Sequence, residues 1–459
     1  MLKLLLINPI SKTQVKGSRL FGGYQMSPLG LAYLAALTPA HWEIKIIDEY
    51  WDDFRFEPAD LVGITAFTPT INRAYEIASV FKDKNIPVAM GGIHVSMVPD
   101  ETKQFCDTIV RGEAEAVWPQ LIADFENGCL KADYEGSPAD MAALPLPRRD
   151  LLSPNYKIAT VLTSRGCPMN CDFCSVTTFN KQAFRQRPVE DVLQELEGIE
   201  QKAVIFCDAN LIGYGPEARK NSLALFKGMK ERKLNKWWGT QASLQMAEDE
   251  ELLQAAAAAG CKGLFFGVES FDEETLKQRS KNVNLKSGVK NYAKLFANVH
   301  RQGMVIAGSF VIGNDNDTAQ SLRTLPKFII KNKIDTAILN ILTPLPGTKL
   351  FKNMMQNNLI KKTNYPGDWQ HYDTKQAVFS TQNLDCTEIQ EGWLRIKKEI
   401  YSIRNIIKRF RLTLTCTKSL LLALFCAGAN WGYRQDLGKQ PHRNPADNRP
   451  AKGSNLPFQ

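Results

Sequence analysis

The sequence predicts an α/β protein with two parallel-sheet domains: a Rossmann-like, doubly wound sheet, then a partial (β/α)6 barrel of the TIM type, with a helical C-terminal extension. Two observations carry this prediction. Short apolar runs alternate with helical patterns along residues 1–350, which is typical of parallel sheets covered by helices. A proline-rich stretch without strong periodicity interrupts this alternation at residues 136–155, so we expect a linker between the domains there.

The first domain, residues 1–135, contains five predicted strands. They are the apolar runs Leu2–Asn8, Trp42–Asp48, Leu61–Thr65, Val88–Met90 and Thr108–Arg111. The helical patterns between them are Leu29–Leu37, Ile71–Lys84 and a helix that begins near Glu115. Parallel sheets of this kind bind ligands beyond the carboxyl ends of their strands. Glycines mark two of these ends, and they either admit a ligand to the backbone or simply form tight turns.

Residues 156–350 repeat the alternation six times at a spacing of about 30 residues, which favours a partial barrel. The predicted strands are Ile158–Thr163, Val204–Cys207, Trp237–Gln241, Leu264–Val268, Val305–Ile312 and Thr336–Leu342. The predicted helices are Val189–Glu200, Ala218–Arg232, Asp249–Ala259, Lys286–Gln302 and Ser321–Lys333. Chemistry on such a barrel belongs at the carboxyl ends of the strands.

Three cysteines follow the first strand of this barrel. Cys167, Cys171 and Cys174 form a C-x3-C-x2-C pattern on one loop. Thiolates are soft ligands, and three on one loop can hold an iron–sulfur cube, leaving one iron open for another ligand. Zinc is the alternative, but it needs a fourth protein ligand, and the next Cys or His along the chain is Cys207. Purely structural thiols are the third interpretation. We predict the iron–sulfur site.

This loop, with Phe173 before its last cysteine, resembles the signature of radical S-adenosylmethionine enzymes. The resemblance implies a [4Fe-4S] cluster whose open iron is chelated by S-adenosylmethionine, which reductive cleavage converts to methionine and a 5′-deoxyadenosyl radical. It also implies cofactor contacts at later strand ends. They would come from Asp208, Asn210, Gln241, Ser243, Glu269, Gly308 and Gly313, in addition to Phe173. Any one of the polar residues could instead cap a helix.

The first domain resembles the cobalamin-binding domain that precedes many radical S-adenosylmethionine barrels. The resemblance rests on the segments Asn8-Pro9, Ser27–Leu31, Gly91–His94 and Arg111–Glu115. It implies cobalamin contacts at Ser27, Gly91, Gly92, His94, Gly112 and Glu113. The D-x-H-x-x-G loop that supplies a cobalt-ligating histidine in mutase-type domains does not follow the first strand. His94 is the only histidine near a strand end, and we interpret it as a loop residue rather than a cobalt ligand.

The C-terminal part is predicted as a helical extension or lid over residues 351–434 and a disordered tail over 435–459. Asn364–Tyr372 is aromatic and polar, and could cap the open barrel. Tyr401–Trp431 combines basic residues with an apolar run, the composition of a helix that lies at a membrane surface. The alternative is a helix packed on the barrel with a solvated basic face.

Charge and composition limit the functional classes. Lys397–Gln459 contains twelve Lys or Arg and three Asp or Glu, which accounts for the whole formal net charge of +9. Positive charge is therefore local, and no nucleic-acid partner is expected. Apolar runs stay short of the roughly 20 residues that a spanning helix needs. Ten cysteines, three of them crowded into one loop, favour metal ligation in a reducing cytoplasm, with peripheral membrane contact through the C-terminal helix as a further possibility.

The sequence thus predicts an enzyme that acts on a small-molecule or lipid substrate, with an electron donor such as flavodoxin or ferredoxin. Its cofactors, as the two resemblances imply, are a [4Fe-4S] cluster, S-adenosylmethionine and cobalamin. Its leading predicted reaction is cobalamin-dependent methylation of an unactivated carbon in a secondary metabolite, a pigment or an isoprenoid lipid. Radical cyclisation or rearrangement without methyl transfer is the first alternative. A non-catalytic iron–sulfur binding or sensor protein is the alternative from another class, but it would not need polar groups at the later strand ends.

Overall fold

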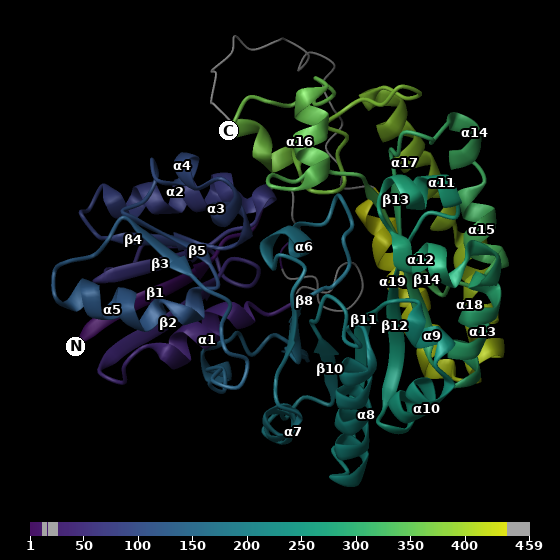
Figure 1. Cartoon of the computed structure of the whole chain (residues 1–459), viewed down its shortest axis with the longest axis horizontal. Coiled ribbons are helices and arrows are strands. Elements are labelled where there is room, and N and C mark those ends of the chain that lie inside the picture. The colour runs from purple at the N-terminus through teal and green to yellow at the C-terminus, as the bar shows by residue number, and fades with distance from the viewer. Residues whose placement is uncertain (12–15, 17–25, 438–459) are drawn as a thin grey trace.

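The computed structural model describes residues 1–11, 16 and 26–437 and has the predicted α/β architecture (Figure 1). Two six-stranded sheets follow one another along the chain. All paired strands within these two sheets are parallel. Parallel neighbours need long crossover connections, and here these connections form helices that cover the sheets. The predicted fold class is confirmed.

The first sheet has the strand order β2-β1-β3-β4-β5-β6. Its strands are β1 (Leu2–Asn8), β2 (Trp42–Asp48), β3 (Leu61–Thr65), β4 (Val88–Gly91), β5 (Thr108–Gly112) and β6 (Asp133–Gly136). Its helices are α1 (Leu29–Leu37), α2 (Ile71–Lys82), α3 (Ile93–Met97), α4 (Pro99–Thr102) and α5 (Trp118–Glu126). Strand β6 was not predicted, because only Tyr134 of its four residues is buried and a polar edge strand has no apolar run.

The second sheet has the order β14-β13-β12-β11-β10-β7, so each strand lies beside its sequence neighbour and β7 and β14 form the two edges. Its strands are β7 (Ile158–Val161), β10 (Ala203–Phe206), β11 (Trp237–Ala242), β12 (Cys261–Glu269), β13 (Val305–Ile312) and β14 (Thr336–Ile341). Its helices are α7 (Val189–Glu197), α8 (Pro216–Glu231), α9 (Gln245–Glu248), α10 (Glu250–Ala258), α11 (Glu273–Gln278), α12 (Asn282–Ser287), α13 (Tyr292–Arg301), α14 (Ala319–Leu322) and α15 (Leu325–Lys331). This sheet is the predicted partial barrel.

Two helices that were predicted as continuous are divided. The pattern of residues 286–302 forms α12 and α13, because Gly288 between them has a φ of +76°, which does not continue a right-handed helix. The pattern of residues 321–333 forms α14 and α15, and Pro326 lies in the first turn of α15, where its missing N–H costs nothing. Apolar periodicity continues across both breaks, so periodicity alone did not reveal them.

The core joins the two sheets. One apolar cluster lies between the first sheet and its helices α1 and α5. A larger cluster begins on the other face of the first sheet and continues through the barrel into the C-terminal extension. This cluster therefore joins the two domains into one continuous core.

The aromatic segment Asn364–Tyr372 lies against the first domain. It contains a 3-10 helix, η5 (Gly367–His371), whose Trp369 is fully buried. The indole Nε1 of Trp369 donates a hydrogen bond of 3.0 Å to the Glu101 carboxylate, and its ring meets the His94 ring edge-on. These side chains tie the extension to the first domain. A lid function of residues 351–434 stays a prediction.

The remaining helices of the extension are α16 (Lys349–Gln356), α17 (Cys386–Ile400), α18 (Ile403–Thr417) and α19 (Leu420–Asp436). The sequence predicted one helix across α18 and α19, but Lys418 adopts a left-handed φ of +53° and separates them. The two helices pack against each other, and α19 also packs on β14 while α18 packs on α13 and α17. Thr413 and Asn430 donate hydrogen bonds to the side chain and the carbonyl of Asp335, respectively.

Within the part of the chain that the structure describes, no helix has both the length and the apolar character needed to cross a bilayer. Helix α19 ends at Asp436, slightly beyond the predicted end of the extension. Most of the tail predicted to be disordered, residues 438–459, lies outside the described residues.

Candidate active site

The cysteine loop lies inside a short antiparallel hairpin that the sequence did not predict. Strand β7 ends at Val161, and the chain then forms β8 (Ser164–Gly166), which pairs with β9 (Phe184–Gln186). The cysteines and the short helix α6 (Ser175–Phe179) make up the connection. Gly166 has a φ of +84°, and a Cβ atom there would lie 2.0 Å from the Ala183 carbonyl oxygen, so only glycine permits this pairing.

The three thiols share one partly enclosed space. Cys171 is buried, and Cys167 and Cys174 are half-buried. Burial raises the pKa of Cys171 to about 11, against a lowering by Lys281, and the other two thiols add to the rise. In the described residues, no three His, Cys, Asp or Glu side chains converge closely enough to hold a single metal ion, which is what zinc requires. A cube takes each thiolate on a different iron, and three soft thiolates on one loop meet that requirement.

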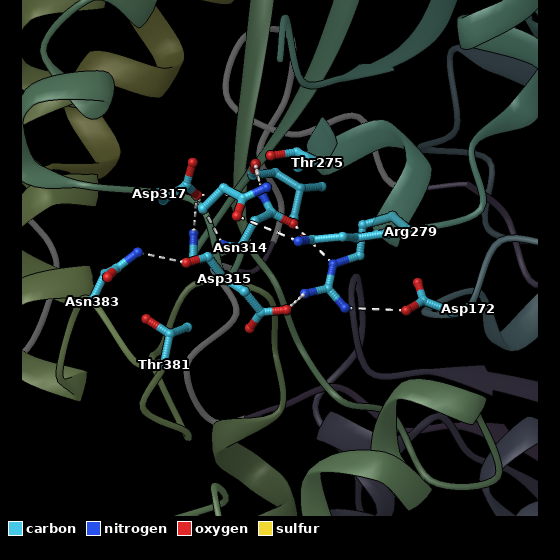
Figure 2. A network of polar contacts seen from close by, with 12 residues as sticks. Asp172, Thr275, Arg279, Asn314, Asp315, Asp317, Thr381 and Asn383 are labelled. Atoms are coloured by element: carbon cyan, nitrogen blue, oxygen red, sulfur yellow. Dashed lines mark hydrogen bonds and ion pairs between the residues drawn. The ribbon is translucent and has the colours of Figure 1, made fainter. Parts of the chain in front are cut away.

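Arg279 clamps the cysteine loop to the end of β13 (Figure 2). Its guanidinium donates hydrogen bonds to Asp172 (3.1 Å), Asp315 (2.7 Å) and Asn314 (3.2 Å). Asp172 stands between two of the cysteines, and its backbone is held as well: its N–H donates to the Arg279 carbonyl, and its carbonyl accepts from the Leu350 N–H. Side chain and backbone of one loop residue are thus anchored to two distant segments.

Lys281 and Glu269 form an ion pair beside the thiols. The Lys281 Nζ lies 3.0 Å from the Glu269 Oε1, and both side chains are largely buried. Burial would lower the pKa of Lys281, but Glu269 and the thiols of Cys171 and Cys174 raise it above its ordinary value. Glu269 ends β12 with a φ of +62°, a conformation that is uncommon for a residue other than glycine and concentrates at functional sites. A fixed positive charge therefore stands next to the cysteine loop.

Asp208 is fully buried at the end of β10. Its Oδ1 accepts hydrogen bonds from the backbone N–H and the hydroxyl of both Thr163 and Ser164, which lead into the hairpin. Burial raises the pKa of Asp208 to about 6, although these hydrogen bonds oppose the rise. Its Oδ2 has no hydrogen-bond partner in the described part of the chain. Asp208 thus positions the hairpin, and its contact with S-adenosylmethionine stays a prediction.

Asn210 connects the loops that follow β10 and β11. Its Oδ1 accepts from the Ser243 N–H at 3.0 Å, and its Nδ2 donates to the Gly213 carbonyl at 2.9 Å. The Ser243 hydroxyl is buried and, among the described residues, has no hydrogen-bond partner. The backbone carbonyl of Gln241 accepts from Leu211. The structure therefore brings three of the predicted cofactor residues together and leaves one hydroxyl available for a ligand.

A cavity of about 350 Å³ lies at the ends of β12 and β13, within the size range of ligand sites. Its lining consists of Glu269, Ser270, Phe271, Asp272, Glu274, Thr275, Val311, Ile312, Asn316, Asp317, Ser321, Leu322 and Leu325. Gly313 follows directly, and its N–H donates to Asp317 at 2.8 Å. Gly308 lies inside β13 beside Phe310, and Phe173 packs on the larger apolar cluster. Of the residues predicted for S-adenosylmethionine, Glu269 is the one that lines this cavity.

The glycines of the first domain are explained by backbone packing. Gly92 has a φ of +109°, and a Cβ atom there would lie 2.6 Å from the Ala66 carbonyl oxygen. Gly112 has a φ of +75°, and its Cβ would lie 2.3 Å from the Gly136 carbonyl oxygen. Gly91, at the end of β4, has only ordinary contacts. Two of the three glycines are therefore required whether or not a ligand approaches, and they do not by themselves identify cobalamin.

Glu113 joins the two domains. Its carboxylate is paired with Arg165 (2.8 Å) and Arg185, one from each strand of the hairpin, and it accepts from the Ala139 N–H. Burial would raise the pKa of Glu113, but the Arg185 hydrogen bond and the Arg165 charge lower it below its ordinary value. Arg165 also pairs with Glu115. With both arginines in place, a cobalamin contact of Glu113 stays a prediction.

His94 was interpreted as a loop residue, but it lies in helix α3 and is fully buried. Its Nδ1 is 3.1 Å from the Thr68 hydroxyl, and its Nε2 is 3.6 Å from the Glu101 carboxylate. Burial lowers its pKa, against the opposing effect of Glu101. Ser27 is also buried, and its N–H donates to the Thr160 hydroxyl of β7, which places it at the contact of the two domains. Neither residue is exposed at the sheet edge.

Four positively charged residues around the site were not predicted from the sequence: Arg165, Arg185, Arg279 and Lys281. Their partners are far away along the chain, so no local pattern marks them. The available signal was their position, since two of them flank the cysteine motif and two follow the end of β12 within a dozen residues.

Two families match separate parts of the chain. The family described as "B12 binding domain" matches residues 22–122, which hold most of the first sheet. The family described as "Radical SAM superfamily" matches residues 161–325, which run from the end of β7 into α15. The cysteine loop lies in the second match, and Gly91, Gly92 and Gly112 lie in the first.

Three known proteins show how far the likeness extends. Bacteriochlorophyllide d C-12(1)-methyltransferase of Chlorobaculum tepidum is 30% identical over 89% of this chain and 89% of its own length. Bacteriochlorophyllide d C-8(2)-methyltransferase of the same organism is 28% identical over 83% and 87%. The solved structure of the radical S-adenosylmethionine methyltransferase TsrM from Kitasatospora setae, with cobalamin and a [4Fe-4S] cluster bound, matches with a TM-score of 0.67 at 14% identity, over 87% of this chain and 88% of that one. At this identity the match shows a shared fold.

Proposed function

Because the chain belongs to the radical S-adenosylmethionine enzymes that carry a B12-binding domain, we propose that it methylates an unactivated carbon of a tetrapyrrole pigment. Its family makes it an enzyme whose cofactors are a [4Fe-4S] cluster, S-adenosylmethionine and cobalamin. The observation that carries the proposal is the position of Cys167, Cys171 and Cys174 on one anchored loop at the carboxyl end of β7, beside a buried lysine.

The bound cofactors would supply an adenosyl radical that abstracts hydrogen and a methyl group that replaces it. The protein's own residues bind and orient them. The three cysteines would hold three irons of the cluster. The Lys281 ammonium would neutralise the carboxylate at the methionyl end of S-adenosylmethionine. The Glu269 carboxylate would accept hydrogen bonds from the amino group at the same end. The buried Ser243 hydroxyl can complete such a contact.

The substrate class is supported by the relatives. Both bacteriochlorophyllide d methyltransferases align with more than four fifths of this chain, so the likeness includes part of the extension as well as the two matched domains. Methylation of a macrocycle side chain needs no charged nucleophile from the protein, and the cavity beside β12 and β13 has a partly apolar lining of Phe271, Val311 and Leu325. Radical cyclisation without methyl transfer is the reaction that would replace this proposal.

The test uses anaerobically reconstituted protein, a chemical reductant and S-adenosylmethionine with a deuterated methyl group. With a chlorin substrate, mass spectrometry should detect a product that has gained one labelled methyl group. The triple variant of Cys167, Cys171 and Cys174 to Ala should lose the cluster and all turnover. Cys207→Ala and Cys261→Ala are matched controls and should keep both. A product without the label, or with a mass decreased by hydrogen loss, would replace methylation by cyclisation.

The partners and the location complete the proposal. A small-molecule substrate agrees with the relatives. Reductive cleavage needs single electrons, so we also propose a flavodoxin or ferredoxin as electron donor. The ten cysteines, three of them crowded into one loop, support a reducing cytoplasm as the location. An electron-transfer assay with purified flavodoxin in place of the chemical reductant tests this partner, and a protein that cleaves S-adenosylmethionine only with the chemical reductant would contradict it.

A further inference from the structure

The hairpin of α18 and α19 exposes an apolar face. Seven of the fourteen large apolar side chains that are exposed among the described residues lie on these two helices. Their exposed fractions lie between 46% and 56%. They are Ile403, Ile407, Leu420, Leu421, Leu424, Phe425 and Trp431. Scattered single apolar residues are normal on a surface, but a contiguous group marks an interaction site.

The opposite face of the hairpin already has its partner within the protein. In α18, Arg409 is buried, and its guanidinium donates a hydrogen bond to the Ile400 carbonyl. The Thr413 hydroxyl donates a hydrogen bond to the Asp335 carboxylate. In α19, Asn430 is bonded to the Asp335 carbonyl. The hairpin is therefore fixed on the barrel by polar contacts. The exposed apolar side chains take no part in these polar contacts.

The charges on the exposed face have a single sign. Four basic side chains are exposed on or directly after α18: Arg404, Lys408, Arg411 and Lys418. Ile403 and Ile407 lie on the same face of α18, because residues three or four positions apart are neighbours on a helix. Residues 401–435 contain six Lys or Arg and no Asp or Glu. Apolar side chains bordered by cations are the pattern of a helix that lies in the headgroup region of a bilayer.

We propose that this face, defined by the seven apolar and four basic side chains above, docks the protein on an anionic lipid membrane. A second copy of the chain is a poor occupant, because an isologous contact would bring two positive faces together. An anionic bilayer offers apolar acyl chains and negative headgroups at the same place. The inference goes beyond the proposed reaction and rests on it only in that a pigment or lipid substrate is met at a membrane.

The test is flotation of the full-length, reconstituted protein with vesicles of phosphatidylcholine, with and without phosphatidylglycerol. Each basic residue near an anionic surface contributes about 1 kcal/mol, which is about fivefold in partitioning. Reversing two charges in Lys408→Glu/Arg411→Glu should therefore lower partitioning into anionic vesicles by at least about 25-fold. Lys227→Glu/Lys230→Glu on α8 changes the net charge equally and should have little effect. Raising the salt from 0.1 to 1 M shortens screening from about 10 to about 3 Å and should weaken wild-type binding.

The apolar part is tested by Leu421→Glu, with Leu146→Glu as its control. Both leucines are about half exposed, so both variants should fold, but only Leu421→Glu should reduce flotation. Truncation of the extension is a poorer test, because it would also remove the partners of Asp335. S-adenosylmethionine cleavage in solution should be unchanged in all four variants, so failure of docking and failure of the proposed reaction are distinguishable.

Three results would overturn the inference. Equal binding to vesicles with and without phosphatidylglycerol would remove the role of charge. Loss of flotation in either control variant would show that the effect does not belong to this face. A wild-type dimer that Leu421→Glu converts to a monomer, measured by light scattering, would assign the face to a second copy.

Discussion

Replacing Arg279 by Met should loosen the cysteine loop. The Arg279–Asp172 pair is largely buried, with side chains 8% and 17% exposed. Removing one partner of a buried pair costs about 3–5 kcal/mol. Burial already raises the pKa of Asp172, so protonation of the orphaned carboxylate will limit the cost, and we expect about 3 kcal/mol, the lower end of that range. Asp315 is 44% exposed, so Asp315→Asn should cost only about 0–1 kcal/mol.

The loss should be local, and amide hydrogen exchange measures local opening directly. In the reduced protein without its cluster, the Asp172 and Leu350 amides are bonded within the clamp and report on it. At about 1.4 kcal/mol per factor of ten, Arg279→Met should accelerate exchange in peptides 167–174 and 345–352 by about 100-fold. Peptides of the first sheet should not change. An acceleration of less than about tenfold, or an equal effect of Asp315→Asn, would refute the assignment of the clamp to the buried pair.

Four further predictions follow from the site. Because the pKa of Asp208 is raised to about 6, its stabilising contribution is complete below about pH 4 and is lost as the pH rises through about 6. Relative to Asp208→Asn, the wild type should lose up to about 3 kcal/mol of unfolding free energy over that range, and parallel pH profiles of the two proteins in urea unfolding would contradict this. Lys281→Ala should raise the KM for S-adenosylmethionine and keep the cluster absorption, with partial rescue in Lys281→Arg, whereas an unchanged KM would remove Lys281 from the cofactor site. Gly92→Ala should destabilise the protein by about 1–3 kcal/mol of strain and so lower its melting temperature, whereas Gly91→Ala should not. The opposite order of melting temperatures would contradict the backbone explanation. Residues 9–28 contain no histidine and His94 is buried, so His94→Ala should retain cobalamin, and the electron paramagnetic resonance of bound cob(II)alamin should lack splitting from a protein imidazole.

The candidate cluster ligands could be recognised in the sequence because they are local. Cys167, Cys171 and Cys174 lie within eight residues, so chain connectivity alone keeps them close together in any fold. Strand positions were also predictable, since both faces of each central strand are buried and the run of apolar residues is continuous, as in β1, where the four residues Leu4–Ile7 have no exposed surface.

The roles of individual polar residues could not be predicted in the same way. Glu113 looked like a ligand contact because it follows a strand end, but the hairpin strands bring Arg165 and Arg185 to it from 52 and 72 residues away. His94 lies near a strand end and was interpreted as a loop residue, but the chain turns into α3 directly after Gly92. Its burial depends on Trp369, which is contributed by the distant extension. A position at the end of a strand fixes where the backbone of a residue lies, but it does not determine which groups surround the side chain.

The sequence by itself determined the order of two parallel α/β domains and the proximity of the three candidate cluster cysteines, because periodicity and close spacing are local properties of the chain. Only the tertiary structure decided which charges meet. Arg279 and Asp172 are 107 residues apart, and the side of the α18–α19 hairpin left exposed depends on which side packs on β14, α13 and α17. Such contacts are set by how the carboxyl ends of the strands converge and how the layers pack, and several sets of polar partners satisfy the same apolar pattern.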